Sequence, residues 1–243
     1  MTTRVAVVTG GASGIGRAVV QRLAHEFHVV VWDRDGEAAA ATAHQLQQVG
    51  GTTVSAATVD VTDRAIVQEA VEAIRTEHGR LDVLVNAAGM AQFVEFEELS
   101  EAQWDRMFDV NTKGVFNCTQ AVVPLMREHG YGRVVSVSSI GAYSGSPSHA
   151  HYAASKAAVI GFSKALCKEL GPFGITVNCV APGVIDTPMV GDMSEEARER
   201  YANNPVGRMG EPEDVAHAIM YLASEGAGYT TGWVISMNGG MYT

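Results

Sequence analysis

The chain has 243 residues, 47% of them hydrophobic, and its 17 Lys and Arg against 27 Asp and Glu give a formal net charge of −10 at pH 7. This acidic balance argues against nucleic acid or an anionic membrane as a partner, because both select basic surfaces. No apolar run is long enough to span a bilayer, and a predicted strand begins within the first five residues, which leaves no room for a signal peptide. Cys118, Cys167 and Cys179 show no metal or redox spacing, so we expect reduced thiols, no metal site and a cytoplasmic protein.

The amino-terminal segment predicts a strand, a glycine-rich turn and a helix. A β-branched run at 4–9 leads into T-G-G-A-S-G-I-G, and helical periodicity follows over 14–26. Gly10 allows a tight turn, Gly14 lets the backbone approach a pyrophosphate, and Gly16 lets the helix pack on the strand. The turn therefore predicts a dinucleotide phosphate site, although an ordinary loop is the alternative. The residues assigned to the dinucleotide here are Gly10, Ser13, Gly14, Ile15 and Gly16.

Asp33 ends the next predicted strand, 28–33, about twenty residues beyond the glycines. A carboxylate at this place can bind the adenosine ribose hydroxyls and repels a 2′-phosphate, so the sequence favours NAD over NADP. Ser13 agrees, since it stands where a basic residue could otherwise meet that phosphate. Arg34 opposes this interpretation because it could swing toward a 2′-phosphate, and the alternative role for Asp33 is that of a turn residue in D-R-D-G.

Short β-branched strands alternate with helices along the rest of the chain. Further strands are expected at 53–59, 82–86, 133–138, 175–180 and near 232–237, and helices at 36–49, 64–78, near 101–128, at 151–170 and around 194–202. This alternation predicts an α/β fold, a single Rossmann-type doubly wound parallel sheet with helices on both faces. No linker or repeat divides residues 1–243, so we expect one domain. The stretch 187–206 mixes apolar, acidic and turn residues after a strand end, and we interpret it as a mobile substrate loop rather than a plain surface excursion.

Tyr152 and Lys156 lie four residues apart on the helix predicted over 151–170, so their side chains share one face. A cation beside a phenol lowers the phenol pKa toward neutrality, which suits proton exchange with an alcohol or ketone. The pattern Y-x-x-x-K is also a common accident of a half-buried Tyr and a solvated Lys. His149 and His151 precede this tyrosine, and we interpret them as pocket lining or exposed loop rather than as a proton shuttle.

Taken in order, these motifs resemble the short-chain dehydrogenase/reductase family over essentially the full length of the chain. The T-G-x-x-x-G-x-G loop, a D-V pair, an N-[NA]-A-G segment and a P-G-x-x-x-T segment all occur. The resemblance implies cofactor contacts from Asp60, Val61, Asn86, Ala87, Gly89, Pro182, Gly183 and Thr187, as well as from Tyr152 and Lys156. It also implies a catalytic set made of Asn111, Ser139, Tyr152 and Lys156.

The resemblance further implies hydride transfer between the nicotinamide and a carbinol carbon. In that chemistry Tyr152 exchanges the proton with the substrate oxygen, and Ser139 hydrogen-bonds this oxygen. Lys156 lowers the tyrosine pKa and binds the nicotinamide ribose, while Asn111 holds a water that links the lysine to solvent. Plainer alternatives exist, since Ser139 could merely end a strand and Asn111 could cap or bend a helix.

The stretch Y-A-A-S-K-A-A-V-I-G-F-S-K and the final N-G-G-M-Y look closest to bacterial 3-oxoacyl-(acyl carrier protein) reductases. Those enzymes usually use NADPH and dock the carrier through basic residues, whereas this chain has Gly130 and Phe173 near those places, with Glu128 nearby. Two enzyme functions therefore stay open, an NADH-dependent 3-oxoacyl-thioester reductase and an NAD-dependent dehydrogenase of a diol, hydroxy acid, sugar alcohol or cyclic alcohol. A non-catalytic dinucleotide-sensing protein is the third possibility, and the complete catalytic set argues against it.

The resemblance also implies a homotetramer, joined through the helices near 101–128 and at 151–170 and through the C-terminal strand. The closing sequence G-W-V-I-S-M-N-G-G-M-Y-T is apolar to its end, whereas free termini are usually polar and frayed. We therefore expect a homotetramer that binds a small ketone or alcohol, or an acyl thioester, and that binds neither nucleic acid nor a membrane.

Overall fold

Seven parallel strands form one sheet in the computed structural model, which describes residues 3–48, 53–191 and 193–242. Their order across the sheet is β3-β2-β1-β4-β5-β6-β7. The strands are β1 (Val5–Thr9), β2 (His28–Asp33), β3 (Thr53–Thr58), β4 (Val83–Asn86), β5 (Gly132–Val137), β6 (Ile175–Pro182) and β7 (Val234–Met237). The order reverses between β1 and β4, and open parallel sheets bind ligands at the carboxyl ends of their strands beside such a reversal.

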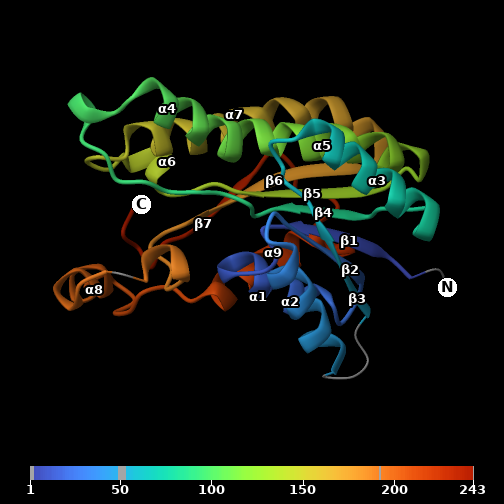
Figure 1. The fold of residues 1–243 in the computed structure, drawn as a ribbon, viewed down its shortest axis with the longest axis horizontal. Helices are drawn as coiled ribbons and strands as arrows, with labels where there is room; N and C mark the ends of the chain where they lie inside the picture. The colour runs from blue at the N-terminus through green and yellow to red at the C-terminus, as the bar shows by residue number, and fades with distance from the viewer. Residues whose placement is uncertain (1–2, 49–52, 192, 243) are drawn as a thin grey trace.

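Helices cover both faces of this sheet (Figure 1). One face carries α1 (Gly14–Leu23), α2 (Gly36–Gln48) and α9 (Pro212–Ala223), and the other carries α3 (Arg64–His78), α5 (Gly114–Glu128) and α7 (Ala150–Leu170). The predicted doubly wound α/β fold is therefore confirmed. No helix in the described part of the chain is long and apolar enough to cross a membrane.

Both faces of the sheet are buried under helices, which explains why the strand sequences are nearly continuous apolar runs. Along β1, Ala6 and Val8 belong to one hydrophobic core, while Val5 and Val7 belong to the core on the opposite face. This alternation follows from the period of two in a strand, and it buries both faces of the sheet.

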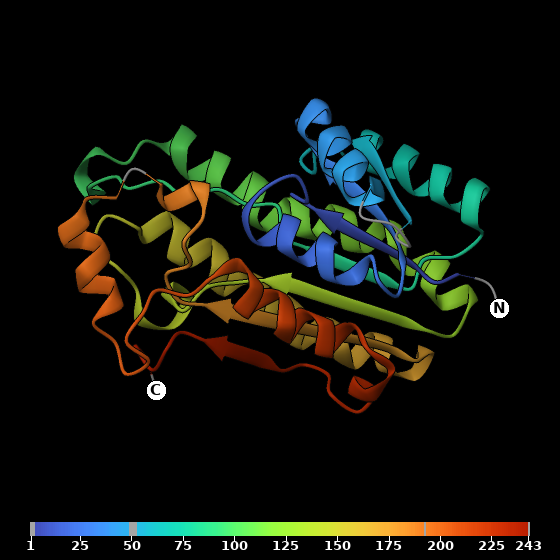
Figure 2. The same ribbon diagram turned by 90° about the horizontal axis from the view of Figure 1, so that it is seen from below.

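The carboxyl ends of the strands point toward the end of the molecule where α8 (Glu195–Ala202) and the C-terminus lie (Figure 2). Two other short helices, α4 (Glu101–Phe108) and α6 (Gly141–Ser144), lie at the same end. The predicted loop over 187–206 thus stands beyond the carboxyl ends of the strands, where a ligand of this fold binds.

Local sequence signals predicted the bounds of some helices and strands correctly. The structure has β2 and α3 at their predicted bounds, and α3 begins after Asp63, whose side chain accepts hydrogen bonds from the amides of Ala65 and Ile66. It ends at Gly79, which adopts the left-handed conformation typical of a helix C-terminus. The predicted last residue of the second helix, 49, lies outside the described residues.

The long helix predicted near 101–128 runs from Glu101 to Glu128, but it is not uniform. One turn of π-helix, Asp109–Lys113, separates α4 from α5, and the amide of Gly114 donates five residues back to the carbonyl of Asp109. The side chain of Asn111 within this turn bonds to the backbone of Met90, which belongs to the segment after β4. A long-range contact therefore holds the extra residue of the π turn in place.

Two helices lie outside those expected from the sequence, α6 and α9. Helix α9 has a clear start signal, because Pro212 occupies its first turn and Glu211 and Asp214 form a reciprocal capping box. Helix α6 is a single turn between β5 and α7, too short to leave a periodic pattern.

Candidate active site

The glycine-rich turn after β1 has a shape that requires glycine. Gly10 has a φ of +65°, and a Cβ on it would lie 2.8 Å from the Cα of Ala88. A Cβ on Gly16 would collide with the carbonyl oxygen of Gly10. The turn therefore lies tightly between the end of β4 and the start of α1. Ser13 precedes α1 without using its hydroxyl as a helix cap, so this hydroxyl and the helix N-terminus fit a phosphate.

Thr9 joins this turn to the end of β4. Its hydroxyl oxygen accepts hydrogen bonds from the amides of Ala87 at 3.1 Å and Ala88 at 3.0 Å. The neighbouring Asn86 donates its amide to Thr119 and Ser136, both at 3.2 Å, while its buried Oδ1 finds no partner among the described residues. An unpaired buried acceptor at the reversal of strand order fits a site that binds a polar ligand.

Asp33 stands at the carboxyl end of β2. Its two carboxylate oxygens accept the amides of Ala12 at 3.2 Å and of Asp35 at 3.1 Å. The oxygen that accepts the amide of Asp35 acts as expected of a turn residue. The oxygen that accepts the amide of Ala12 joins the end of β2 to the glycine-rich turn. The carboxylate therefore lies at the carboxyl end of β2 beside the glycine-rich turn, and its predicted contact with the adenosine ribose stays a prediction.

Asp60 lies beside this aspartate, because the amide of Val59 donates to the Asp33 carbonyl at 2.8 Å. Hydrogen bonds from the side chain and backbone of Thr62 hold the pKa of Asp60 below its usual range, and the charge of Arg34 also lowers this pKa. Arg34 is exposed and acts on Asp60. The charge of Arg106 lowers the pKa of Asp60 as well, so two arginines face the carboxylates of Asp33 and Asp60.

Ser139, Tyr152 and Lys156 come together where β5 ends and α7 begins. The side chains of Ser139 and Tyr152 share a hydrogen bond. Lys156 is only 6% exposed, and its Nζ donates to the carbonyl of Val137 at 2.9 Å and lies 5.9 Å from the centre of the tyrosine ring. The structure thus places the predicted serine, tyrosine and lysine as neighbours.

Burial determines the protonation of this group. It raises the pKa of Tyr152, while the hydrogen bond with Ser139 opposes the rise, and it lowers the pKa of Lys156 to about 8. The raised pKa differs from the expectation of a tyrosine pKa lowered toward neutrality, because burial of the phenol outweighs the effects that oppose it. The tyrosine is therefore a protonated phenol at neutral pH and can act as a proton donor.

Asn111 reaches the same place from the π turn. Its Oδ1 accepts the amide of Met90 at 2.9 Å, and its Nδ2 donates to the hydroxyl of Ser155 on α7 at 3.1 Å. A Cβ on Gly89 would lie 3.2 Å from this Oδ1 and 3.3 Å from the Nζ of Lys156. The asparagine and the lysine therefore flank one glycine, and a side chain at position 89 would crowd both of them.

The ends of β6 and β7 complete the site. The carbonyl of Pro182 accepts the amide of Ile140 at 3.0 Å, which joins the end of β6 to the residue after Ser139. The methyl carbon of Thr187 lies 3.4 Å from the position of a Cβ on Gly14, so the segment after β6 touches the glycine-rich turn. The predicted nicotinamide and phosphate residues are thus neighbours in space.

The remaining predicted residues lie around this arrangement. Gly183 donates its amide to Met237 on β7, Val61 is buried beside Gly114, and Ile15 packs against the core beneath α1. The side chain of Ile15 is partly buried by this packing. Sequence reasoning missed the anchoring roles of Thr9 and Ser155, although Thr9 opens the glycine motif and Ser155 lies between the predicted tyrosine and lysine.

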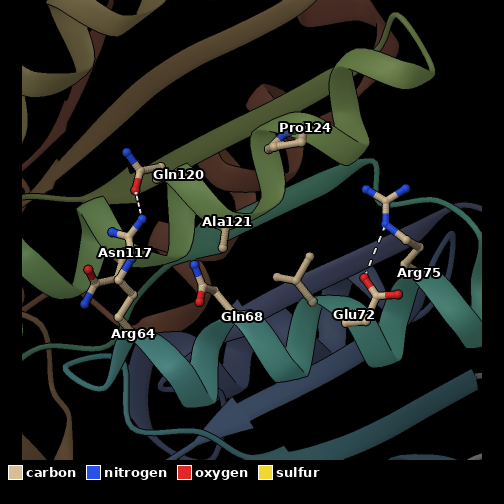
Figure 3. A pocket seen from close by; sticks show the side chains of 9 residues that line it. Arg64, Gln68, Glu72, Arg75, Asn117, Gln120, Ala121 and Pro124 are labelled. Carbon is tan, nitrogen blue, oxygen red and sulfur yellow. Dashed lines mark hydrogen bonds and ion pairs between the residues drawn. The ribbon is translucent and has the colours of Figure 1, made fainter.

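A surface groove of about 320 Å³ lies between α3 and α5, away from these residues (Figure 3). It is lined by Arg64, Gln68, Val71, Glu72, Arg75, Asn117, Gln120, Ala121 and Pro124. Arg64 bonds to Gln120 and Arg75 pairs with Glu72, so its charged groups are largely satisfied within the groove. None of the predicted site residues lines it, and we therefore place the active site at the carboxyl ends of the strands.

Comparison with known proteins agrees with this geometry. A family model described as short chain dehydrogenase matches residues 4–198. The chain is 42% identical over 240 residues to a 3-oxoacyl-[acyl-carrier-protein] reductase FabG of Thermotoga maritima, covering 98% of this chain and 97% of the relative. It is 41% identical over 239 residues to the (2S)-[(R)-hydroxy(phenyl)methyl]succinyl-CoA dehydrogenase subunit BbsD of Thauera aromatica, covering 98% and 96%. The crystal structure of gox2181 superposes with a TM-score of 0.92 at 36% identity, covering 98% of this chain and 95% of that one.

The fold, the ordered motifs and these relatives define a dinucleotide-dependent oxidoreductase. The chain belongs to the short-chain dehydrogenase family, whose members interconvert ketones and alcohols with a nicotinamide cofactor.

Proposed function

We propose that this protein is an NADH-dependent reductase of 3-oxoacyl thioesters, built as one domain over residues 1–243. The observation that carries the proposal is the convergence of Ser139, Tyr152, Lys156 and Asn111 beside the glycine-rich turn. Several relatives bear the name of a 3-oxoacyl reductase, which supports the substrate class. Purified protein that oxidises NADH with a 3-oxoacyl thioester supports this function, and protein that binds NADH without turning over any ketone fits a dinucleotide sensor.

The second candidate is an NAD-dependent dehydrogenase of a secondary alcohol. The Thauera aromatica relative, named as a dehydrogenase of a hydroxyacyl-CoA, favours it. The raised pKa of Tyr152 favours reduction at neutral pH, since alcohol oxidation needs the phenolate. A panel of alcohols and 3-oxoacyl thioesters, each tested with NAD(H) and NADP(H), separates the two functions.

In the proposed mechanism the protein orients its ligands and moves one proton. NAD(H), when bound, supplies the hydride. Ser139 holds the substrate oxygen against Tyr152, which donates its proton to that oxygen. Lys156 binds near the nicotinamide ribose, and Asn111 holds the water through which the tyrosine is reprotonated. The loop over 187–206, with α8 at its centre, covers the substrate.

We predict that Asp33 sets the cofactor preference. The wild type should have a higher kcat/KM with NADH than with NADPH, because Asp33 and Asp60 repel a 2′-phosphate. Asp33→Ala should shrink or reverse that ratio, since Arg34 then has one carboxylate fewer beside it. Asp35→Asn is the matched control, because Asp35 caps α2 and should leave the ratio unchanged. A wild type that prefers NADPH would show that the charge argument is wrong.

We also predict that a carrier protein gives no advantage over a small thioester. The arginine nearest Phe173 is Arg127, whose guanidinium lies 3.7 Å from the centre of that ring, and Glu128 pairs with Arg75 at 2.6 Å. The cation near Gly130 is therefore Arg127, which is stacked on the ring of Phe173. The chain as a whole has a formal net charge of −10. The kcat/KM should therefore be no higher for the carrier-protein thioester than for the CoA ester, and it should change little with salt. A much higher value with the carrier that falls steeply with salt would mean that other basic residues dock it.

A homotetramer is the assembly that we propose. Strand β7 is an edge strand, since among the described strands it pairs only with β6, and an unpaired edge invites another chain. Trp233 beside it is 65% exposed, and Tyr221 and Tyr229 are also exposed. Light scattering at micromolar concentration should give four times the chain mass of 25.7 kDa, and Trp233→Glu should lower that mass. A wild-type monomer would contradict the proposal.

A further inference from the structure

Three aromatic rings stand in a row at the entrance to the catalytic group. The ring of Phe93 lies on the ring of His149, with 3.8 Å between their centres, and the ring of His149 lies 5.2 Å from that of Tyr152. The sequence analysis interpreted His149 only as pocket lining or loop. The stacking places this imidazole directly beside the proposed proton donor.

A strained backbone holds the imidazole there. Ser148 has a φ of +58°, and it is the one residue other than glycine with a positive φ in the described ranges of the chain. Its carbonyl accepts the amide of Val94 at 2.8 Å, and its hydroxyl donates to the carboxylate of Glu95 at 2.7 Å. Strain of this kind persists only where surrounding contacts enforce it, and it concentrates at functional sites.

The polar atoms of this imidazole are not used for folding. His149 precedes α7 as its N-cap residue, yet its side chain makes no capping hydrogen bond. Its Nε2 is buried and has no partner within the part of the chain that the structure describes. Burial and the nearby His151 lower the pKa of His149, so the ring is neutral at neutral pH and can donate one hydrogen bond. A buried polar atom without a partner, beside a proton donor, points to a ligand atom as its partner.

Phe93 packs on the imidazole from the solvent side of the site. Its ring lies on that of His149 but is itself 68% exposed, so few contacts oppose its rotation. Exposed side chains change rotamer within nanoseconds. An apolar, movable ring thus stands next to the imidazole.

We propose that His149 is a specificity-determining residue, whose Nε2 binds the second carbonyl oxygen of a neutral 3-oxoacyl ester or thioester while Tyr152 binds the first. This inference rests on the proposed function and narrows its substrate class. Glu95 stands beside the strained turn and disfavours an anionic substrate end, so a free 3-oxo acid should be a poor substrate. A ketone without a second carbonyl should gain nothing from His149.

The test compares His149→Gln with His149→Met, two side chains of similar length of which only Gln hydrogen-bonds through its end. Three substrates are used with NADH: an S-acetoacetyl thioester of N-acetylcysteamine, free acetoacetate, and pentan-2-one. The matched control is His25→Met, because His25 is exposed and lies just after α1, outside the predicted catalytic group. Thermal melts confirm that each variant is folded.

With the thioester, His149→Met should lower kcat/KM about tenfold, chiefly through KM, and His149→Gln should stay within about threefold of the wild type. With pentan-2-one both variants should stay within about threefold of the wild type, and the wild type should favour the thioester over acetoacetate. Equal losses in both variants, or an equal loss with pentan-2-one, would show that His149 is merely structural and overturn the inference. A wild type that reduces none of the three substrates would instead overturn the proposed function, and this inference with it.

Discussion

Tyr152→Phe should lower kcat for ketone reduction by at least about 10²–10⁴-fold, while the Kd for NADH stays nearly unchanged. The substitution removes only the hydroxyl that would give its proton to the substrate oxygen. Because burial raises the pKa of Tyr152, the wild-type kcat/KM for reduction should be highest at and below neutral pH and should fall as pH rises through that pKa. Alcohol oxidation should show the opposite trend. Steady-state kinetics across pH and fluorescence titration with NADH measure both quantities.

Tyr143→Phe is the control for this variant. Tyr143 lies on α6 near the same site, is partly exposed, and stacks on Tyr242 with 5.8 Å between ring centres. Its hydroxyl has no proposed role in proton transfer, so kcat should change little. A Tyr152→Phe enzyme that retains wild-type kcat would remove Tyr152 from the mechanism.

Lys156→Met should abolish activity and weaken NADH binding without lowering stability at pH 7. The pKa of Lys156 is about 8, below the reference of about 10.4 for an unburied lysine, so its buried ammonium costs on the order of 3 kcal/mol at neutral pH. The unfolded chain binds more protons than the folded chain between these two values. Stability from this group therefore rises with pH across that window, and the penalty is full below pH 8.

Loss of the hydrogen bond to the Val137 carbonyl opposes this gain by about 1–3 kcal/mol. The melting temperature of Lys156→Met at pH 7 should therefore equal or exceed that of the wild type, and any excess should shrink as pH approaches 10. Lys168→Met, on the exposed side of the same helix, is the control and should retain activity. A clear loss of melting temperature at pH 7 would show that the buried ammonium stabilises the fold.

Elements with local signals could be predicted from the sequence. The bounds of α3 follow from a capping aspartate and a terminal glycine, and those of β2 from a β-branched run that ends in Asp33. The π turn could not be predicted, because the contact that holds it joins Asn111 to Met90, twenty-one residues away in sequence. Helix α9 could have been found from its proline and capping box.

The candidate active site likewise has features that the sequence predicts and features that it does not. The residue types and their order predict the group of Ser139, Tyr152 and Lys156, and the structure places these residues together. Their protonation could not be predicted, since a pKa depends on burial, which the sequence pattern does not give. The rings of Phe93 and His149 were likewise inaccessible to sequence analysis, because they stack only through the folding of two distant loops.

The π turn at Asp109–Lys113 makes the active site sensitive to the length of one helix. A π turn holds one residue more than a regular α-helix needs, and each residue turns an α-helix by about 100°. Deletion of a single codon within it would yield an unbroken helix, with Asn111 rotated away from Lys156. The secondary structure and most of the core would survive the deletion of this one residue. In this fold, therefore, one extra residue within the helix from Glu101 to Glu128 decides whether the side chain of Asn111 lies beside Lys156.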